Sequence, residues 1–251
     1  IDVMRGGHGE LAIGPVFPGH WAYNDRLQPL PYDPDSARAL LQMAGIRDAS
    51  GDSILDLPDG RSFEFELQYP ASSALNRGLA ELMQSQLARI GVRVTLRPTD
   101  FQVMIADMTS PERKFDAVLM GWASDFRLNL RDLFHSNARG GPYQFASYSN
   151  PEVDRILDET AVTVDRTRAK PRWDRLQEIM REEQPWTFLY YFPDLYVANE
   201  RLQGVEMDGR GALVNVARWW VRPLDEQTTP VAPEPGDSTA RSRTQGAAPA
   251  R

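Results

Sequence analysis

Residues 63–69 read FEFELQY and alternate apolar with polar side chains, which is the pattern of a half-buried β-strand. Leucine, methionine and isoleucine then recur at helical spacing and predict a helix from about Ser73 to Arg89. After Gly91, residues 92–96 read VRVTL and alternate again. Strand, helix and strand at this spacing predict a right-handed βαβ unit with parallel strands, and so an α/β fold class.

The flanking segments extend this α/β pattern. Asp33-Pro34 predicts a helix start, because Asp caps a helix and Pro suits its first turn, and Gly45 ends that helix. A shorter helix is expected at about 100–108. The strand predicted at 115–120 is nearly all apolar, so we expect helices to cover both of its faces.

The C-terminal half predicts further helices and an aromatic strand. The helices are expected at about 127–135, 151–161 and 167–183, and apolar residues at helical spacing mark the second and the third. Residues 186–192 read WTFLYYF, a composition typical of a strand, and residues 195–198 are expected to continue it.

The two ends of the chain have different compositions from its middle. Residues 1–32 are rich in Gly, Pro and aromatic residues and predict an irregular, partly packed entry segment. Residues 223–251 hold almost no large apolar side chain, so we expect a disordered tail that cannot offset its ordering entropy. The chain starts at Ile1 without a signal peptide, and we interpret it as a processed or truncated piece.

Composition narrows the classes of function. The formal net charge of −7 argues against nucleic acid as the main partner, because phosphate binding needs a basic face. The absence of cysteine excludes disulfides, thiolate catalysis and Cys-based zinc sites. No apolar run approaches the ~20 residues that span a bilayer.

Local motifs for catalysis or metal binding are absent from the sequence. There is no P-loop, dinucleotide fingerprint or Gly-x-Ser-x-Gly elbow. A Ser-His-Asp triad stays open, because its members meet only in space. We interpret His8, His20 and His135 as surface or loop histidines, since none has a second histidine at helical spacing. Two carboxylate pairs could serve acid/base chemistry but are interpreted as solvated charge: Asp56 with Asp59, and Asp132 with Asp158.

The end of the strand at 115–120 is the strongest candidate for a binding site. In open α/β sheets, ligands lie beyond the carboxyl ends of the strands, and Trp122 and Asp125 follow this end directly. A tryptophan offers a flat apolar wall, and a carboxylate attracts an ammonium group. The alternative interpretation is that Trp122 is a core residue and that Asp125 caps a helix beginning near Arg127.

Four stretches occur in the order that one known family shows. They are YDPDSARALL at 32–41, Phe115-Asp116 followed by Gly121-Trp122 and Asp125, YSNPEVD at 148–154, and Tyr190-Tyr191. From about residue 6 to residue 221 the chain resembles the solute-binding proteins of peptide ABC importers, the oligopeptide- and dipeptide-binding group.

The resemblance implies a periplasmic-binding-protein-like α/β fold of the class II type, with two lobes that close on a solute about a hinge. Most of the second lobe would lie at 33–186. The hinge strand and the segment returning to the first lobe would lie at 187–222, between the entry segment and the tail at 223–251.

The resemblance also implies ligand-binding roles for Trp122, Asp125, Tyr191 and Phe192. In the family, the carboxylate matching Asp125 holds the α-ammonium of a peptide, and the tryptophan matching Trp122 lines a side-chain pocket. Phe192 falls about where an aromatic residue contacts the ligand from the hinge. Some oligopeptide binders carry an arginine where this chain has Leu119, which leaves peptide length and recognition of the peptide carboxylate open.

The function implied by the resemblance is binding, not catalysis. The expected protein captures peptides or similar small amine-bearing solutes and delivers them to the permease subunits of an ABC importer. No cofactor, metal or nucleic acid is expected, and the complete protein is expected to be a monomer. The expected location is periplasmic or extracytoplasmic, with a membrane anchor through a missing N-terminus as an option. A hydrolase on the same scaffold, and a sensory protein that reports ligand occupancy to a receptor, are the alternatives.

Overall fold

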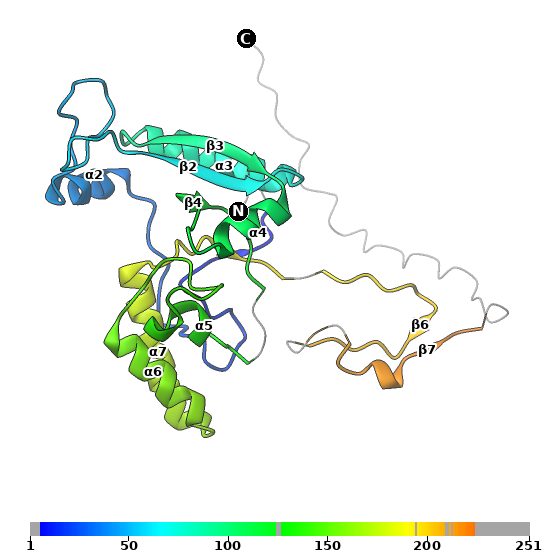
Figure 1. The fold of residues 1–251 in the computed structure, drawn as a ribbon. Coiled ribbons are helices and arrows are strands. Elements are labelled where there is room, and N and C mark those ends of the chain that lie inside the picture. The colour runs from blue at the N-terminus through cyan, green and yellow to red at the C-terminus, as the bar shows by residue number, and fades with distance from the viewer. Residues whose placement is uncertain (1–5, 124–126, 194, 209–210, 212, 224–251) are drawn as a thin grey trace, which may run out of the picture. The chain divides into compact units, whose positions relative to one another are not determined.

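The computed structural model describes residues 6–123, 127–193, 195–208, 211 and 213–223 (Figure 1). Contacts divide the chain into two compact units, Ile1–Asp194 and Leu195–Arg251, which are described separately. Among the described residues, no helix combines the length and the apolar character that crossing a membrane requires.

The first unit contains a parallel three-stranded sheet. Strand β2 (Glu64–Pro70) is central and pairs with β3 (Arg93–Thr99) on one side and β4 (Ala117–Val118) on the other. Helix α3 (Ala74–Ala88) connects β2 to β3, and the hydroxyl of Ser73 caps it by accepting a hydrogen bond from a backbone N–H. The predicted βαβ unit is therefore confirmed.

The strand with both faces covered is β2, not the one predicted at 115–120. Successive strand residues point to opposite faces, and Leu67, Gln68 and Tyr69 are all buried. Helices α3 and α4 (Phe101–Thr109) both contact β2. A strand is present within 115–120 as predicted, but β4 lies at the edge of the sheet with only two paired residues, both half-buried, so the burial of both faces expected for it was wrong.

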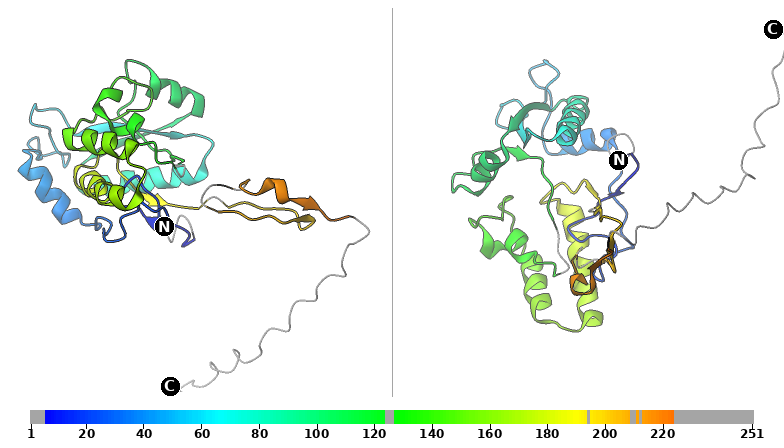
Figure 2. Two further views of the ribbon diagram at one scale, coloured as in Figure 1. Left: turned by 90° about the horizontal axis from the view of Figure 1, so that it is seen from below. Right: turned by 90° about the vertical axis from the view of Figure 1, so that its right-hand side faces the viewer.

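Local capping signals place the other predicted helices. Helix α2 (Pro34–Met43) begins after Asp33, whose carboxylate accepts hydrogen bonds from two backbone N–H groups. Gly45, in the left-handed conformation with φ +79°, follows its end. Helices α6 (Pro151–Val162) and α7 (Arg166–Glu183) lie side by side in Figures 1 and 2, and the caps Asn150 and Asp165 start them. Together with α5 (Arg131–Phe134) they form much of the second core of this unit.

The helix predicted at 127–135 is much shorter in the structure. Helix α5 spans only Arg131–Phe134 and is followed by a 3-10 turn at Ser136–Ala138. Leu128 has φ +50°, a left-handed conformation that a right-handed helix does not include. Leu128, Leu133 and Phe134 are nevertheless buried, so their apolar character reflects core packing rather than a longer helix.

The described part of the entry segment, residues 6–32, is irregular as predicted. Its one strand, β1 (Glu10–Leu11), pairs antiparallel with β5 (Tyr190–Tyr191). The packing expected of this segment is confirmed by the buried side chains Ile13, Val16, His20, Ala22 and Asn24.

The aromatic strand predicted at 186–192 is present only as β5, and residues 195–198 form no strand. Extended segments become strands only where a second segment pairs with them, and β1 provides two partners. In the second unit, β6 (Leu202–Gln203) pairs with β7 (Trp220–Val221) after a 3-10 turn at Val216–Arg218. Residues 224–251 lie outside the described part of the chain, so the disordered tail stays a prediction.

Candidate ligand-binding site

The order of the strands marks the place where a ligand is expected. The chain leaves β2 for β3 on one side and then crosses over β2 to form β4 on the other. Such a reversal is a topological switch point, and ligands of open α/β sheets bind there, beyond the carboxyl ends of the strands. Trp122 follows the last residue of β4 by four positions and so lies just beyond the carboxyl end of that strand.

Trp122 belongs to a group of four aromatic rings, here called the aromatic wall. Its ring centroid lies 6.1 Å from Tyr143, 6.4 Å from Phe145 and 5.8 Å from Trp186, in each case edge to face. This is the arrangement that aromatic pairs prefer. Trp122 is 43% exposed, so it lies at the margin of the core. The alternative interpretation, that Trp122 is a core residue, was therefore wrong.

The aromatic wall is anchored in the helical core. Trp186 stacks on Phe145, with centroids 6.1 Å apart and planes at 23°, and the ring of Phe134 lies 4.9 Å from that of Trp186. Phe134, on α5, has no exposed surface. The rings therefore run from a closed core residue outward to the half-exposed Trp122, which gives Trp122 a rigid support.

Arg113 holds the loop that carries two rings of the wall. Its guanidinium donates hydrogen bonds to the carbonyl oxygens of Met108, at the end of α4, and of Gly141. The guanidinium carbon also lies 5.9 Å from the centre of the Phe145 ring, within cation–π range. Gln144, which is buried, donates to the carbonyl oxygen of Tyr148 at 2.6 Å. The loop is therefore tied down before and after Phe145.

Asp125 lies outside the described residues, so its ammonium-binding role stays a prediction. The described residues 127–130 form no helix, whereas the alternative interpretation expected one to begin near Arg127. The next helix begins at Arg131, and its N-cap residue is Leu130, which makes no side-chain capping bond.

Tyr191 has a structural contact that the sequence did not predict. Its hydroxyl accepts hydrogen bonds from the backbone N–H groups of Ile13 and Gly14, at 3.2 and 3.1 Å, and donates to the carbonyl oxygen of Gly14 at 2.7 Å. Burial raises the pKa of Tyr191 above its ordinary value. The hydroxyl therefore joins β5 to the entry segment. The neighbouring Phe192 is half exposed, and the ligand contacts expected of Tyr191 and Phe192 both stay predictions.

Two of the three histidines, His20 and His135, lie in loops as one half of the interpretation expected, but both are buried, so a surface position was wrong for them. His20 Nδ1 accepts a hydrogen bond from Ala22 N at 3.1 Å, and its ring lies 5.4 Å from Phe17. His135 Nδ1 accepts from Asn137 N at 3.0 Å and caps the 3-10 turn. Within the described ranges, no three His, Asp or Glu side chains could hold a metal ion together.

The carboxylates considered for acid/base chemistry each have another contact. Asp56 is buried, not solvated, and accepts from two backbone N–H groups, while Asp59 pairs with Arg61. Asp132 accepts from a neighbouring amide side chain, and Asp158 forms an ion pair with an arginine of α5. These contacts give the four carboxylates structural roles.

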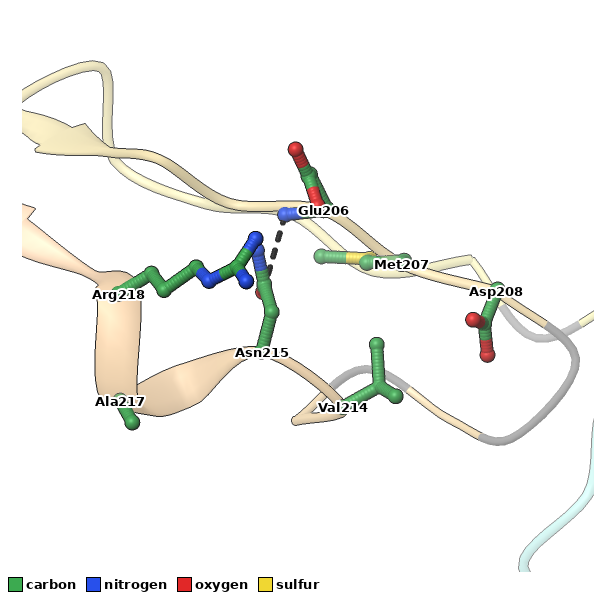
Figure 3. Close-up of a pocket in the computed structure, with 7 residues that line it drawn as sticks. All are labelled: Glu206, Met207, Asp208, Val214, Asn215, Ala217 and Arg218. Atoms are coloured by element: carbon green, nitrogen blue, oxygen red, sulfur yellow. Dashed lines mark hydrogen bonds between the residues drawn. The ribbon is translucent and has the colours of Figure 1, made fainter.

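The second unit carries a hollow of about 530 Å³ (Figure 3). Asn215 lies at its centre, where its Oδ1 accepts hydrogen bonds from Glu206 N at 3.2 Å and from Trp219 Nε1 at 2.6 Å. The lining residues are Glu206, Met207, Asp208, Val214, Asn215, Ala217 and Arg218. All of them belong to one hairpin-like segment and none was predicted to bind ligand, so the switch point remains the candidate site.

Comparison with known proteins identifies the family. The model described as "Bacterial extracellular solute-binding proteins, family 5 Middle" matches residues 1–144. The chain belongs to this family. It is 30% identical over 223 residues to the oligopeptide-binding protein AppA of Bacillus subtilis, a match covering 88% of this chain and 41% of AppA. It is 26% identical over 190 residues to di/tripeptide-binding protein 1 of Pseudomonas aeruginosa, covering 74% of this chain and 33% of that protein.

Solved structures of family 5 proteins and their relatives share the fold. The structure of AppA in complex with a nonapeptide matches with a TM-score of 0.76 at 28% identity, over 88% of this chain and 44% of that one. MelB from Agrobacterium fabrum C58, in complex with stachyose, matches with a TM-score of 0.73 at 20% identity, over 88% and 36%, and shows the fold alone. These likenesses confirm the predicted periplasmic-binding-protein-like fold class and the predicted family.

Tyr143 and Phe145 were not predicted from the sequence as residues of the site. Both follow the Gly140-Gly141 pair in a loop, where no period of two or 3.6 residues shows which way a side chain points. Two aromatic residues inside an otherwise polar, glycine-containing loop are the one local signal that could have indicated them.

Proposed function

We propose that the protein containing this chain binds peptides or similar small amine-bearing solutes outside the cytoplasm and delivers them to the permease of an ABC importer. The observation that carries the proposal is the aromatic wall at the switch point of a family 5 chain. The names of AppA and of the di/tripeptide-binding protein support peptides as the solute class. The chain spans 41% and 33% of the lengths of these two relatives, so the proposal concerns the whole protein.

In the proposed mechanism the solute binds between two lobes that close about a hinge. Closure is driven by the solute's higher affinity for the closed state. Asp125 receives the ammonium group, Trp122 packs against a solute side chain, and Phe192 adds a contact from the hinge segment. The protein acts as a monomer in the periplasmic or extracytoplasmic space and needs no cofactor and no catalytic group.

Calorimetric titration of the full-length protein with a tripeptide and its N-acetylated form tests the proposal. We expect a strong preference for the free amine, because the acetylated form would leave the carboxylate of Asp125 buried without its partner, which typically costs ~2–5 kcal/mol. That is on the order of 30- to several-thousand-fold in affinity. Asp125→Ala should lose most of this preference, and Asp125→Asn should lose less, since the amide keeps an acceptor.

The matched control is Asp132→Ala, which removes an exposed aspartate of α5 and should leave the preference unchanged. Equal affinity of the unmodified protein for both forms of the tripeptide would refute amine recognition. Chromatography of the tripeptide after long incubation tests the absence of catalysis, and progressive cleavage would favour the hydrolase alternative.

A further inference from the structure

Tyr143 forms an open corner with Trp122 in the aromatic wall. The two rings meet at 72° with their centroids 6.1 Å apart. Tyr143 is 48% exposed and Trp122 is 43% exposed, so both side chains keep apolar surface open to solvent. Two half-exposed rings at nearly a right angle offer one face and one edge to a third group that enters the corner.

The hydroxyl group of Tyr143 has no hydrogen-bond partner within the described part of the chain. Two other tyrosines of this unit differ in that respect. The hydroxyl of Tyr148 donates to Glu183, and the hydroxyl of Tyr191 is bonded to Gly14. Those two hydroxyls hold the fold together, whereas the hydroxyl of Tyr143 is not used for that purpose by the described residues.

The corner is held in place before any ligand arrives. Phe145 and Trp186 support Trp122 from the core side, and Arg113 fixes the loop through the Gly141 carbonyl oxygen and the Phe145 ring. A preformed apolar surface loses little conformational entropy when a ligand binds. The geometry therefore favours recognition of a flat or bulky apolar group over a small one.

We propose that Tyr143 is a specificity-determining residue that, with Trp122, receives an aromatic or large apolar side chain of the bound peptide. This inference rests on the proposed function and names the class of peptide. Each well-placed aromatic pair is worth roughly 2- to 10-fold in affinity beyond its area burial. A peptide with a phenylalanine in this corner therefore binds about tenfold or more tightly than the same peptide with alanine.

The test is calorimetry on the full-length protein with the tripeptides Ala-Ala-Ala, Phe-Ala-Ala, Ala-Phe-Ala and Ala-Ala-Phe. In the unmodified protein at least one phenylalanine position should improve the affinity about tenfold or more over Ala-Ala-Ala. Tyr143→Ala should remove most of that gain with little change for Ala-Ala-Ala. Tyr143→Phe should retain the gain, because the ring remains. Tyr32→Ala, which removes another exposed tyrosine outside the wall, is the matched control and should change nothing.

The outcomes separate this inference from the proposed function. If the tripeptides bind and prefer a free amine, but the phenylalanine gain is absent or survives Tyr143→Ala, the role of Tyr143 is wrong and the proposed function stands. If no tripeptide binds and an oligosaccharide such as raffinose does, both are wrong, because aromatic faces also stack on sugar rings. Melting curves of each variant verify folding, and Tyr143→Phe keeps the test valid if Tyr143→Ala unfolds.

Discussion

Replacement of Gln177 should destabilise the first unit strongly, because its amide joins two segments far apart in the sequence. Gln177 lies on α7 and has no exposed surface. Its Oε1 accepts a hydrogen bond from Asn24 N at 3.1 Å, and its Nε2 donates to the carbonyl oxygen of Ala22 at 2.8 Å. Nε2 also donates to the carbonyl oxygen of Trp173, one turn earlier in the helix, at 2.9 Å.

The size of the effect follows from the groups that Gln177→Met would leave without partners. Methionine has a similar length and helix propensity, so packing and helix formation change little. The N–H of Asn24 and the carbonyl oxygen of Ala22 belong to buried residues and would lose their partner. Each such group costs about 1–3 kcal/mol, so the two together cost roughly 2–6 kcal/mol. For a domain of this size that corresponds to a melting temperature lowered by at least about 4 °C.

Thermal and urea unfolding followed by circular dichroism measure this difference. Gln102→Met on α4 is the matched control, because Gln102 is exposed and should tolerate the change. Gln177→Glu adds a pH test. Burial raises the folded-state pKa of the introduced carboxyl group, so its deficit should grow as pH rises above about 4.3 and shrink below it. A melting temperature of Gln177→Met within about 1 °C of the unmodified protein would refute the reasoning.

Three further predictions concern other contacts. Tyr191→Phe removes the hydroxyl that binds Ile13 and should lower the free energy of unfolding by about 1–3 kcal/mol; an unchanged urea midpoint would contradict this. Hydrogen bonds, chiefly from Arg172, lower the pKa of Glu159, so its stabilising effect is present above the ordinary carboxyl pKa and lost as pH falls through the folded-state pKa. The melting-temperature gap between Glu159→Gln and the unmodified protein should therefore close as pH drops below about 4.3, and a constant gap would count against the ion pair. Removal of residues 224–251 should leave the melting temperature unchanged, and a loss above about 4 °C would show that they are packed.

The candidate site was only partly predictable. Trp122 could be placed from sequence because it follows an apolar segment that ends abruptly, and the structure locates it just beyond β4. Its ring neighbours could not be placed, since Tyr143, Phe145 and Trp186 come from two later segments that meet only when the helical core forms. The anchoring of Tyr191 to Gly14 joins residues 177 positions apart, and no local pattern reports such a contact.

The sequence by itself determined the α/β class, the parallel βαβ unit and the start of each long helix. Those features depend on interactions within a few residues: an alternation of two, a stripe at helical spacing, and a cap such as Asp33 or Ser73. The tertiary structure alone decided that β4 and β5 are short, because β4 pairs with only two of the seven residues of β2, and β5 pairs with the two residues of β1. It also decided that residues 127–130 stay outside a helix and that His135 is buried. These features depend on contacts between segments that are far apart in the sequence and meet only in the folded core. Patterns within a few neighbouring residues do not contain that information.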